Sequence, residues 1–403
     1  MSPLRILQVT PYYEHAWAYG GIPRVVAALA RGLAERGHAV TVCTTDVADE
    51  RSRLSAGRES PSSPPVEVRV FPNLSNRLAY GLQLYTPRGL GRFLEGHAGG
   101  FDVAHIHGCH HLPGVVAARQ LRRAGVPYLL TPNGTAPRIE RRRAAKWLFD
   151  TTVGRRVTPG AALVLAVSEA ERRQLTALGI APNRLRLLPN PLVLDEFDPP
   201  CDRGRLRTRW KLGNGPLVLY LGMLTPRKGL GTLVEAFAAV AGEGVAGAQL
   251  VLAGNDRGMV PELRRRLQRA GCAQQATLTG TLRGRERLEA LADADVLAYP
   301  SRDEAFGLVP LEALLCGTPV VVADDHGCGE VIAAVGGGLR VPPGDVRALA
   351  EALRAVLTDA VQWRRRAADA AHEVRRRFAS ARVCAGLEEL YKEVLAAGSA
   401  RVA

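Results

Sequence analysis

The segment Glu304–Glu312, EAFGLVPLE, followed by Cys316–Val322, CGTPVVV, decides the expected fold. Pro310 favours the start of a helix, because its fixed φ angle and missing N–H group suit the first helical turn. The strand-like run Val320–Ala323 comes directly after that helix. Short apolar runs alternate with helical patterns in this way along the whole chain, which predicts an α/β protein whose parallel sheets are covered by helices.

The start of this helix is also a candidate binding site. The backbone N–H groups around Gly307, Leu308 and Val309 are expected to point, unpaired, off the positive end of the helix, and such an end binds anions. Glu304 precedes the helix and Glu312 lies in its first turns, so both carboxylates can face one cleft. Carboxylates accept hydrogen bonds from hydroxyls, whereas helix N-termini hold phosphates. The pattern therefore fits a nucleotide-sugar.

The same string carries a family resemblance. Two glutamates separated by seven residues, with Phe306-Gly307-Leu308 between them and Ala-Leu-x-Cys-Gly-Thr-Pro-Val after them, resemble the donor-site signature of retaining family 4 glycosyltransferases of the GT-B fold (glycosyl transferases group 1). Glutamates at that spacing alone are common on surface helices, but the full string is specific. The resemblance implies a nucleotide-sugar donor, UDP- or GDP-linked, no metal requirement, and donor contacts from Phe306 to Val309.

Two doubly wound, Rossmann-like domains facing a cleft are expected, with ligands at the carboxyl ends of the strands. We predict an N-terminal domain over residues 1–195, on the acceptor side, and a C-terminal donor domain over 196–378. A helix over 379–403 is expected to cross back to the first domain, as it does in the resembling family. The predicted strands are Leu4–Thr10, Ala39–Thr45, Val66–Phe71, Val103–Ile106, Tyr128–Thr131, Leu163–Val167, Leu185–Leu188, Leu217–Leu221, Gln249–Ala253, Ala276–Thr279, Val296–Tyr299 and Val320–Ala323.

A second element, Gly222–Gly229, follows a predicted strand and opens a helix. It resembles the family's Gly-Arg-Leu…Lys-Gly element, whose arginine and lysine grip the donor diphosphate. Lys228 matches the lysine, but Met223 stands in the arginine position and cannot bind phosphate. Arg227 or Arg283 could supply the missing charge. The stretch fits neither a phosphate-binding P-loop, which needs Gly before the lysine and Ser or Thr after it, nor a dinucleotide fingerprint.

Two elements of the first half complete the candidate site. Gly20 and Gly21 follow the first strand and precede a helix, which leaves amides free for a ligand; alone, the pair would read as a tight turn. In the family this loop lies beside the reaction centre. Asp102–His107 resembles the family's Asp-Val-Val-His-x-His, in which the residue matching His107 contacts the donor sugar.

The histidine-rich run His105–His111 also suggests a metal site at first. His105 and His107 alternate in phase at a strand end, so both rings are expected to share a face. A hydrolase of the metallo-lactamase type would have Asp where Cys109 stands, and no partner ligands occur at suitable spacing. We therefore predict no metal, and a structural role for His105.

Bulk properties fit an ordinary globular protein. Of 403 residues, 47% are hydrophobic and 23% are charged, which allows sizeable cores. A buried strand begins at Leu4, so we expect no signal peptide. The seven cysteines form no CxxC pair and are odd in number, which argues against a disulfide framework and favours a reducing cytosol.

The formal charge of +14 is carried mainly by arginine. The cluster that runs from Arg138 to Lys146 is followed by Trp147 and Phe149; its basic members are Arg138, Arg141, Arg142, Arg143 and Lys146. A basic segment that ends in aromatic residues can rest on anionic lipid headgroups, at the inner face of the membrane. The segment could instead be an ordinary solvated helix face. Binding to a nucleic acid has less support, because the sequence contains no known nucleic-acid-binding module.

The leading hypothesis is a retaining glycosyltransferase that uses a hydroxyl acceptor, in bacterial polysaccharide, glycolipid or other glycoconjugate synthesis. The resemblance implies catalytic roles for His107, Lys228 and Glu304, with Glu312 on the ribose hydroxyls. The alternatives are a nucleotide-sugar epimerase of the same fold and an inactive nucleotide-sugar-binding protein, the latter suggested by Met223. The sequence leaves open the donor base, the donor sugar, the acceptor and the linkage.

Overall fold

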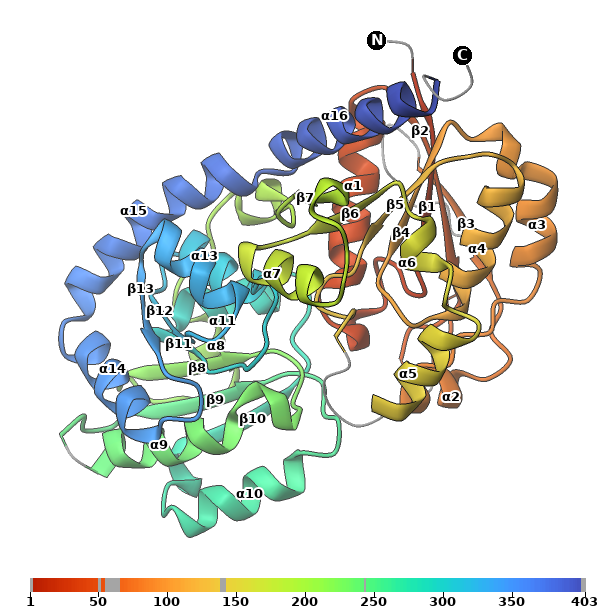
Figure 1. Ribbon diagram of the computed structural model, residues 1–403. Helices are drawn as coiled ribbons and strands as arrows, with labels where there is room; N and C mark the ends of the chain where they lie inside the picture. The colour runs from red at the N-terminus through yellow and green to blue at the C-terminus, as the bar shows by residue number, and fades with distance from the viewer. Residues whose placement is uncertain (1–2, 50–51, 55–65, 138–142, 243, 400–403) are drawn as a thin grey trace. The chain divides into compact units, whose positions relative to one another are not determined.

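The computed structural model describes residues 3–49, 52–54, 66–137, 143–242 and 244–399 (Figure 1). The chain divides into two compact units. Unit 1 comprises Met1–Leu192 together with Ser380–Ala403, and unit 2 comprises Val193–Ala379.

Unit 1 is built on a parallel sheet, which over the described residues has seven strands in the order β3-β2-β1-β4-β5-β6-β7. The strands are β1 Arg5–Val9, β2 Ala39–Thr45, β3 Glu67–Phe71, β4 Val103–His107, β5 Tyr128–Thr131, β6 Leu163–Ala166 and β7 Leu185–Leu187. Its helices are α1 Ile22–Glu35, α2 Asn76–Leu82, α3 Leu90–His97, α4 Leu112–Arg123, α5 Arg143–Thr151, α6 Val157–Gly160, α7 Glu169–Ala177 and α16 Ser380–Ser399, with 3-10 turns η1 Trp17–Tyr19, η2 Ala98–Gly100 and η3 Pro182–Arg184.

Unit 2 repeats the plan. Its described strands form a six-stranded parallel sheet in the order β10-β9-β8-β11-β12-β13. The strands are β8 Leu217–Leu221, β9 Gln249–Ala253, β10 Ala276–Gly280, β11 Val296–Tyr299, β12 Val320–Ala323 and β13 Gly338–Val341. The helices are α8 Arg205–Arg209, α9 Leu230–Gly242, α10 Val260–Arg269, α11 Arg285–Asp293, α12 Leu308–Leu315, α13 Gly327–Val335, α14 Val346–Thr358 and α15 Ala360–Phe378, with 3-10 turns η4 Leu194–Phe197, η5 Pro226–Lys228 and η6 Ala273–Gln275.

The predicted fold class, two doubly wound α/β domains, is therefore confirmed, and each predicted strand is present with ends that differ by at most one residue. One strand was missed. β13 lies at the sheet edge, is only partly buried and carries the exposed Arg340, so its sequence lacks the continuous apolar run of a central strand. The helix of the donor signature also begins at Leu308, two residues before Pro310, with Gly307 as its N-cap residue at φ 83°.

The C-terminal helix α16 belongs to unit 1 because it packs on α1 (Figure 1). A Cβ atom at Gly32 would lie 2.6 Å from the Sγ atom of Cys384, so the glycine allows the two helices to approach closely. Arg36 and Glu388 form an ion pair at 2.6 Å across the same interface. All seven cysteines are unbridged thiols.

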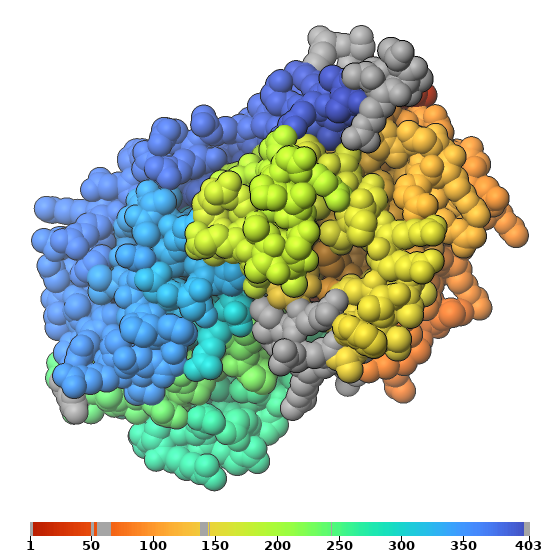
Figure 2. Space-filling model, viewed as in Figure 1, coloured from red at the N-terminus to blue at the C-terminus, as the bar shows by residue number. Residues whose placement is uncertain are grey.

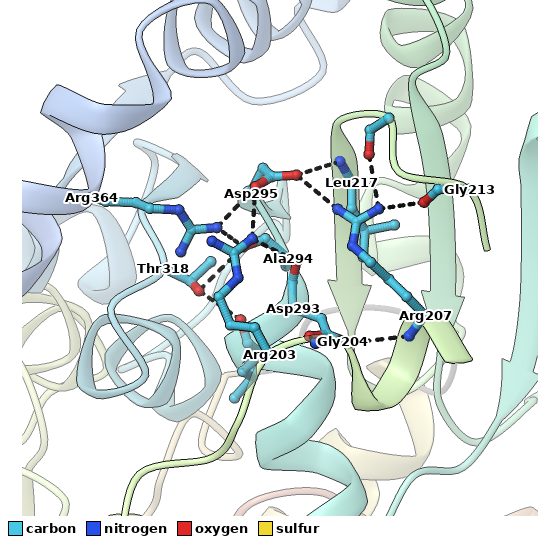
Figure 3. Close-up of polar contacts among 12 residues, drawn as sticks. Arg203, Gly204, Arg207, Gly213, Leu217, Asp293, Ala294, Asp295, Thr318 and Arg364 are labelled. Carbon is cyan, nitrogen blue, oxygen red and sulfur yellow. Dashed lines mark hydrogen bonds and ion pairs between the residues drawn. The ribbon is translucent and has the colours of Figure 1, made fainter. Parts of the chain in front are cut away.

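Asp295, at the amino end of β11, organises the entry to unit 2 (Figure 3). Its carboxylate pairs with three guanidinium groups, those of Arg203 (3.0 Å), Arg207 (3.0 Å) and Arg364 (2.9 Å). It also accepts a hydrogen bond from the Leu217 amide, the first of β8. Burial by itself would raise the pKa of Asp295, but the amide and the arginines outweigh it and hold the pKa below its ordinary value.

The neighbouring Asp293 adds a second anchor. Its carboxylate is fully buried and accepts hydrogen bonds from the backbone N–H groups of Gly204 and Arg207, at the start of α8 (Figure 3). The two aspartates therefore hold the segment before β8 against the amino edge of the sheet.

We predict that Asp295→Asn lowers the free energy of unfolding of unit 2 by on the order of 3 kcal/mol, because three cations lose their shared anion. Thermal unfolding of the variant and the parent protein measures this difference in stability. The matched control is Asp202→Asn, since Asp202 is 80% exposed and its ion pair with Arg205 spans 3.5 Å. Asp295 has a lowered pKa in the folded state, so its contribution is complete above its unfolded pKa of about 4 and is lost as the pH falls further. A difference from the parent protein that persisted unchanged in strong acid would contradict this assignment.

Candidate active site

The strand order reverses between neighbouring strands in each unit, at β1 and β4 in unit 1 and at β8 and β11 in unit 2. Parallel α/β sheets bind ligands at the carboxyl ends of the strands at such a point. In unit 2 the loops that meet there are residues 222–229, after β8, and residues 300–307, after β11. These are the two segments that carry the predicted donor-binding residues.

Lys228 ends η5 and is almost completely buried. Its Nζ atom lies 2.5 Å from Oε2 of Glu304 and donates a hydrogen bond to the hydroxyl of Tyr299 at 3.2 Å. Gly229 makes this approach possible: it has φ 67°, and a Cβ atom there would lie 2.2 Å from the Pro300 carbonyl oxygen. The structure thus brings together two of the predicted catalytic residues from segments 76 positions apart.

Glu304 accepts hydrogen bonds at one oxygen from three side chains: Lys228, Tyr299 (3.2 Å) and Ser301 (3.1 Å). Burial would raise the pKa of Glu304, but the charge of Lys228, its hydrogen bond and the charge of Arg227 outweigh burial and hold the pKa at about 2. The carboxylate is therefore ionised throughout the neutral range, and its side chain keeps 21% exposure toward solvent.

Two helix N-termini adjoin this ion pair. A Cβ atom at Gly307, the N-cap residue of α12, would lie 2.5 Å from Sγ of Cys328 in the first turn of α13. The Cys328 amide donates to the Glu304 carbonyl at 2.9 Å, which fixes the loop to α13. The amides of Leu308 and Val309 occupy the first turn of α12, where no acceptor exists within the helix. The positive ends of both helix dipoles favour an anion here.

Phe306 lies inside the unit rather than at its surface. It is 3% exposed, and its ring meets that of Phe378 on α15 edge to face at 5.3 Å between centroids. Its side chain anchors the loop, and only its backbone lies next to the predicted anion site.

Glu312 is fully buried, one turn along α12 from Leu308. Its carboxylate forms an ion pair at 2.5 Å with Arg287 of α11. Glu312 lies near the start of α12, as predicted, whereas its partner Arg287 was not predicted. A single arginine on a distant helix gives no sequence signal for such a contact.

Met223 presents its carbonyl to the Tyr220 hydroxyl at 2.9 Å and brings no charge to the loop. Of the two proposed substitutes, Arg283 is exposed, whereas the charge of Arg227 lowers the pKa of the Glu304 carboxyl and therefore acts on the site. Arg227 also lies within the same loop, next to Lys228.

The predicted residues of unit 1 lie at the carboxyl edge of its own sheet. Gly20 closes η1 at φ 89°, and Gly21 is the N-cap residue of α1, which has Pro23 in its first turn. His107 ends β4, the strand beside β1. Loops after these two strands flank the reversal of strand order, as in unit 2.

His105 and His107 share one face of β4 as predicted, and their rings stack at 4.1 Å. Both are fully buried, and burial lowers the pKa of His105 to about 3 and that of His107 well below its ordinary value, so both are neutral. His107 Nε2 lies 3.0 Å from Oε1 of Gln8, a partner that the sequence analysis missed. His105 lies between Thr131 (2.7 Å) and Tyr391 of α16 (3.1 Å).

Within the described residues, no group of three or more His, Cys, Asp or Glu side chains could hold a metal ion. No described helix is long and apolar enough to cross a membrane. Of the basic segment, residues 138–142 lie outside the described residues. The following helix α5 lies at the surface of unit 1 (yellow, Figure 2), and its Trp147 and Leu148 side chains are 54% and 56% exposed.

Comparison with known proteins agrees with this geometry. Residues 202–374 match the family model "Glycosyl transferases group 1", and residues 20–191 match the model "Glycosyl transferase 4-like domain". A D-inositol 3-phosphate glycosyltransferase of Stackebrandtia nassauensis is 31% identical over 365 residues, which cover 87% of this chain and 82% of the relative. A GDP-mannose-dependent alpha-(1-6)-phosphatidylinositol monomannoside mannosyltransferase of Mycobacterium tuberculosis is 36% identical over 217 residues, 52% of this chain and 56% of that protein.

Among solved structures, a sucrose-phosphate synthase from Thermosynechococcus elongatus superposes with a TM-score of 0.75 at 25% identity, over 98% of this chain and 100% of that one. The two doubly wound α/β units and this structural neighbour show that the chain has the GT-B fold of glycosyltransferases. The chain belongs to the glycosyl transferases group 1 family and is an enzyme of that family, as its sequence resemblance implied.

We predict that Lys228→Ala lowers kcat by about a hundredfold or more, the scale of one lost electrostatic contact to the transition state. The variant also leaves Glu304 without its cation, so its melting temperature should fall. Lys211→Gln is the matched control, because Lys211 is an exposed lysine of the same unit. An unchanged kcat in Lys228→Ala would remove this residue from the active site.

Proposed function

We propose that the protein transfers a sugar from a nucleotide-sugar to a hydroxyl acceptor, with retention of anomeric configuration. The observation that carries this proposal is the Lys228–Glu304 ion pair beside the N-termini of α12 and α13. A cation and two helix ends suit a diphosphate, and an ionised carboxylate next to them suits the hydroxyls of a sugar.

In this proposal the diphosphate lies against Lys228 and the amides of Leu308 and Val309. Arg227 supplies the charge that Met223 does not, because it already acts electrostatically on Glu304. These groups neutralise the charge that develops on the leaving phosphate, so the proposal assigns no metal or other cofactor to the reaction.

The reaction proceeds on one face of the donor sugar. A bond forms between the acceptor oxygen and the anomeric carbon while the bond from that carbon to the phosphate oxygen breaks. The acceptor proton passes to the departing phosphate oxygen, which balances the reaction. Lys228 stabilises that oxygen, and Glu304, held ionised by its cation, accepts hydrogen bonds from the donor sugar.

The remaining predicted residues are proposed to bind and orient the donor. Glu312 is proposed to accept from the ribose hydroxyls, since it lies one turn below Leu308 on the same side of α12. The backbone from Phe306 to Gly307 lines the diphosphate. In unit 1, His107 is proposed to contact the donor sugar, with Gly20 and Gly21 beside the reaction centre.

The names of the two relatives suggest which donor and acceptor to test. One is named for GDP-mannose, and both relatives are named for inositol-containing acceptors. We therefore propose a UDP- or GDP-linked sugar as donor and a polyol or glycan hydroxyl, free or carried on a lipid, as acceptor in glycoconjugate synthesis. The exposed Trp147 and Leu148 beside the arginine-rich segment support docking of unit 1 on an anionic membrane, which would place the enzyme at the cytoplasmic face.

A transfer assay tests the proposal. UDP- and GDP-sugars are offered with inositol 3-phosphate in solution and with a phosphatidylinositol acceptor in anionic vesicles, and the anomeric configuration of the product is read by NMR. We expect a product with the same anomeric configuration as the donor.

The other outcomes are distinct. An inverted product would contradict the mechanism. Epimerised donor in the absence of acceptor would favour an isomerase, and no turnover with any pair would favour a binding protein. Equal transfer rates with vesicle-borne and soluble acceptors, together with no sedimentation of the protein with vesicles, would contradict membrane docking.

A further inference from the structure

Arg287 joins two carboxylates inside unit 2. Its guanidinium lies 2.5 Å from Oε2 of Glu312 and 2.6 Å from Oε2 of Glu196. The Arg287 side chain is 5% exposed and the Glu312 side chain is not exposed at all, whereas that of Glu196 is 34% exposed. The arginine therefore links the buried carboxylate of Glu312 on α12 to the partly exposed carboxylate of Glu196 on η4.

The charges make this bridge obligatory for Glu312. A fully buried carboxylate is strongly disfavoured unless a cation and hydrogen bonds compensate for lost hydration. Burial would lower the pKa of Arg287, but Glu312 and Glu196 outweigh burial and raise it, so the guanidinium is permanently charged. A planar guanidinium can fix the orientation of a carboxylate, which a lysine ammonium cannot do.

The backbone around Arg287 is held on two sides. Helix α11, which carries it, packs against both α12 and α8. On the same helix, Arg285 donates to the carbonyls of Pro199 (3.0 Å) and Pro200 (3.1 Å), and Glu286 pairs with Arg209 at 3.0 Å. The helix backbone that carries Arg287 is thus held by contacts that do not involve Glu312.

We propose that Arg287 is a positioning residue for nucleotide recognition: it pairs with Glu312 and aims its carboxylate at the ribose hydroxyls, while Glu196 fixes the far side of the guanidinium. The proposal rests on the proposed function, in which Glu312 reads the ribose. It makes the distinction between ribose and deoxyribose depend on a residue that does not itself touch the nucleotide.

The test compares, by calorimetry, the affinities of one protein sample for several nucleotides. The probes are UDP and GDP, their 2′,3′-dideoxy counterparts, and inorganic pyrophosphate. In the parent protein the ribonucleotide should bind on the order of tenfold to a hundredfold more tightly than its dideoxy counterpart, the range of a hydrogen bond to a charged group. In Arg287→Lys this ratio should fall toward one, while the affinity for pyrophosphate stays the same.

The ratio distinguishes positioning from a structural role. Loss of folded protein lowers the binding capacity for both nucleotides and leaves the ratio of their affinities unchanged. Glu196→Gln is the second variant, because it keeps the buried Arg287–Glu312 pair, and it should reduce the ratio part of the way. Arg365→Lys is the matched control, because Arg365 is an exposed arginine on α15 of the same unit, and it should retain the parental ratio.

Three results would overturn the proposal in different ways. A parental ratio in Arg287→Lys would remove Arg287 from ribose recognition and leave the proposed function intact. A ratio of one in the parent protein would show that Glu312 does not read the ribose, although diphosphate binding could stand. Absence of binding by every nucleotide would overturn the proposed function together with this inference.

Discussion

The carboxyl edge of the unit 2 sheet depends on one ion pair, between Lys228 after β8 and Glu304 after β11. The two loops come from neighbouring strands at the point where the strand order of the sheet reverses, and each alone would leave a charge in a poorly hydrated place. The Lys228–Glu304 pair holds the two loops together, and the first turns of α12 and α13 lie beside these loops. The same contact that stabilises the loops therefore brings together the cation, the carboxylate and the amides of the proposed diphosphate site.

The fold could be predicted from the sequence because its central strands are fully buried on both faces and read as continuous apolar runs. The runs Leu217–Leu221 and Val320–Ala323 are examples in which predicted and observed bounds coincide. The prediction missed β13, since a short edge strand with an exposed arginine has no such pattern. It placed the start of α12 at Pro310 rather than Leu308, because proline is compatible with several positions of a first turn.

Residues of the candidate site could be predicted from the sequence only where they belong to a local motif. Lys228, Glu304 and Gly307 stand in strings with a specific resemblance, and the structure brings them to one place. Partners supplied by distant segments gave no signal: Arg287 behind Glu312, Gln8 beside His107, and Asp295 among its arginines are long-range contacts of common residue types. The complete burial of His107 was likewise not predictable, because a histidine at a strand end is compatible with either a buried or an exposed ring.

We propose that the carboxyl edge of the unit 2 sheet binds the diphosphate of a nucleotide-sugar. A crystal structure of the enzyme with an intact UDP- or GDP-sugar tests this binding directly. We expect phosphate oxygens within hydrogen-bond distance of Lys228 Nζ and of the Leu308 and Val309 amides, with Glu304 against the sugar. A nucleotide-sugar bound elsewhere, with the Lys228–Glu304 pair untouched by phosphate or sugar, would contradict it.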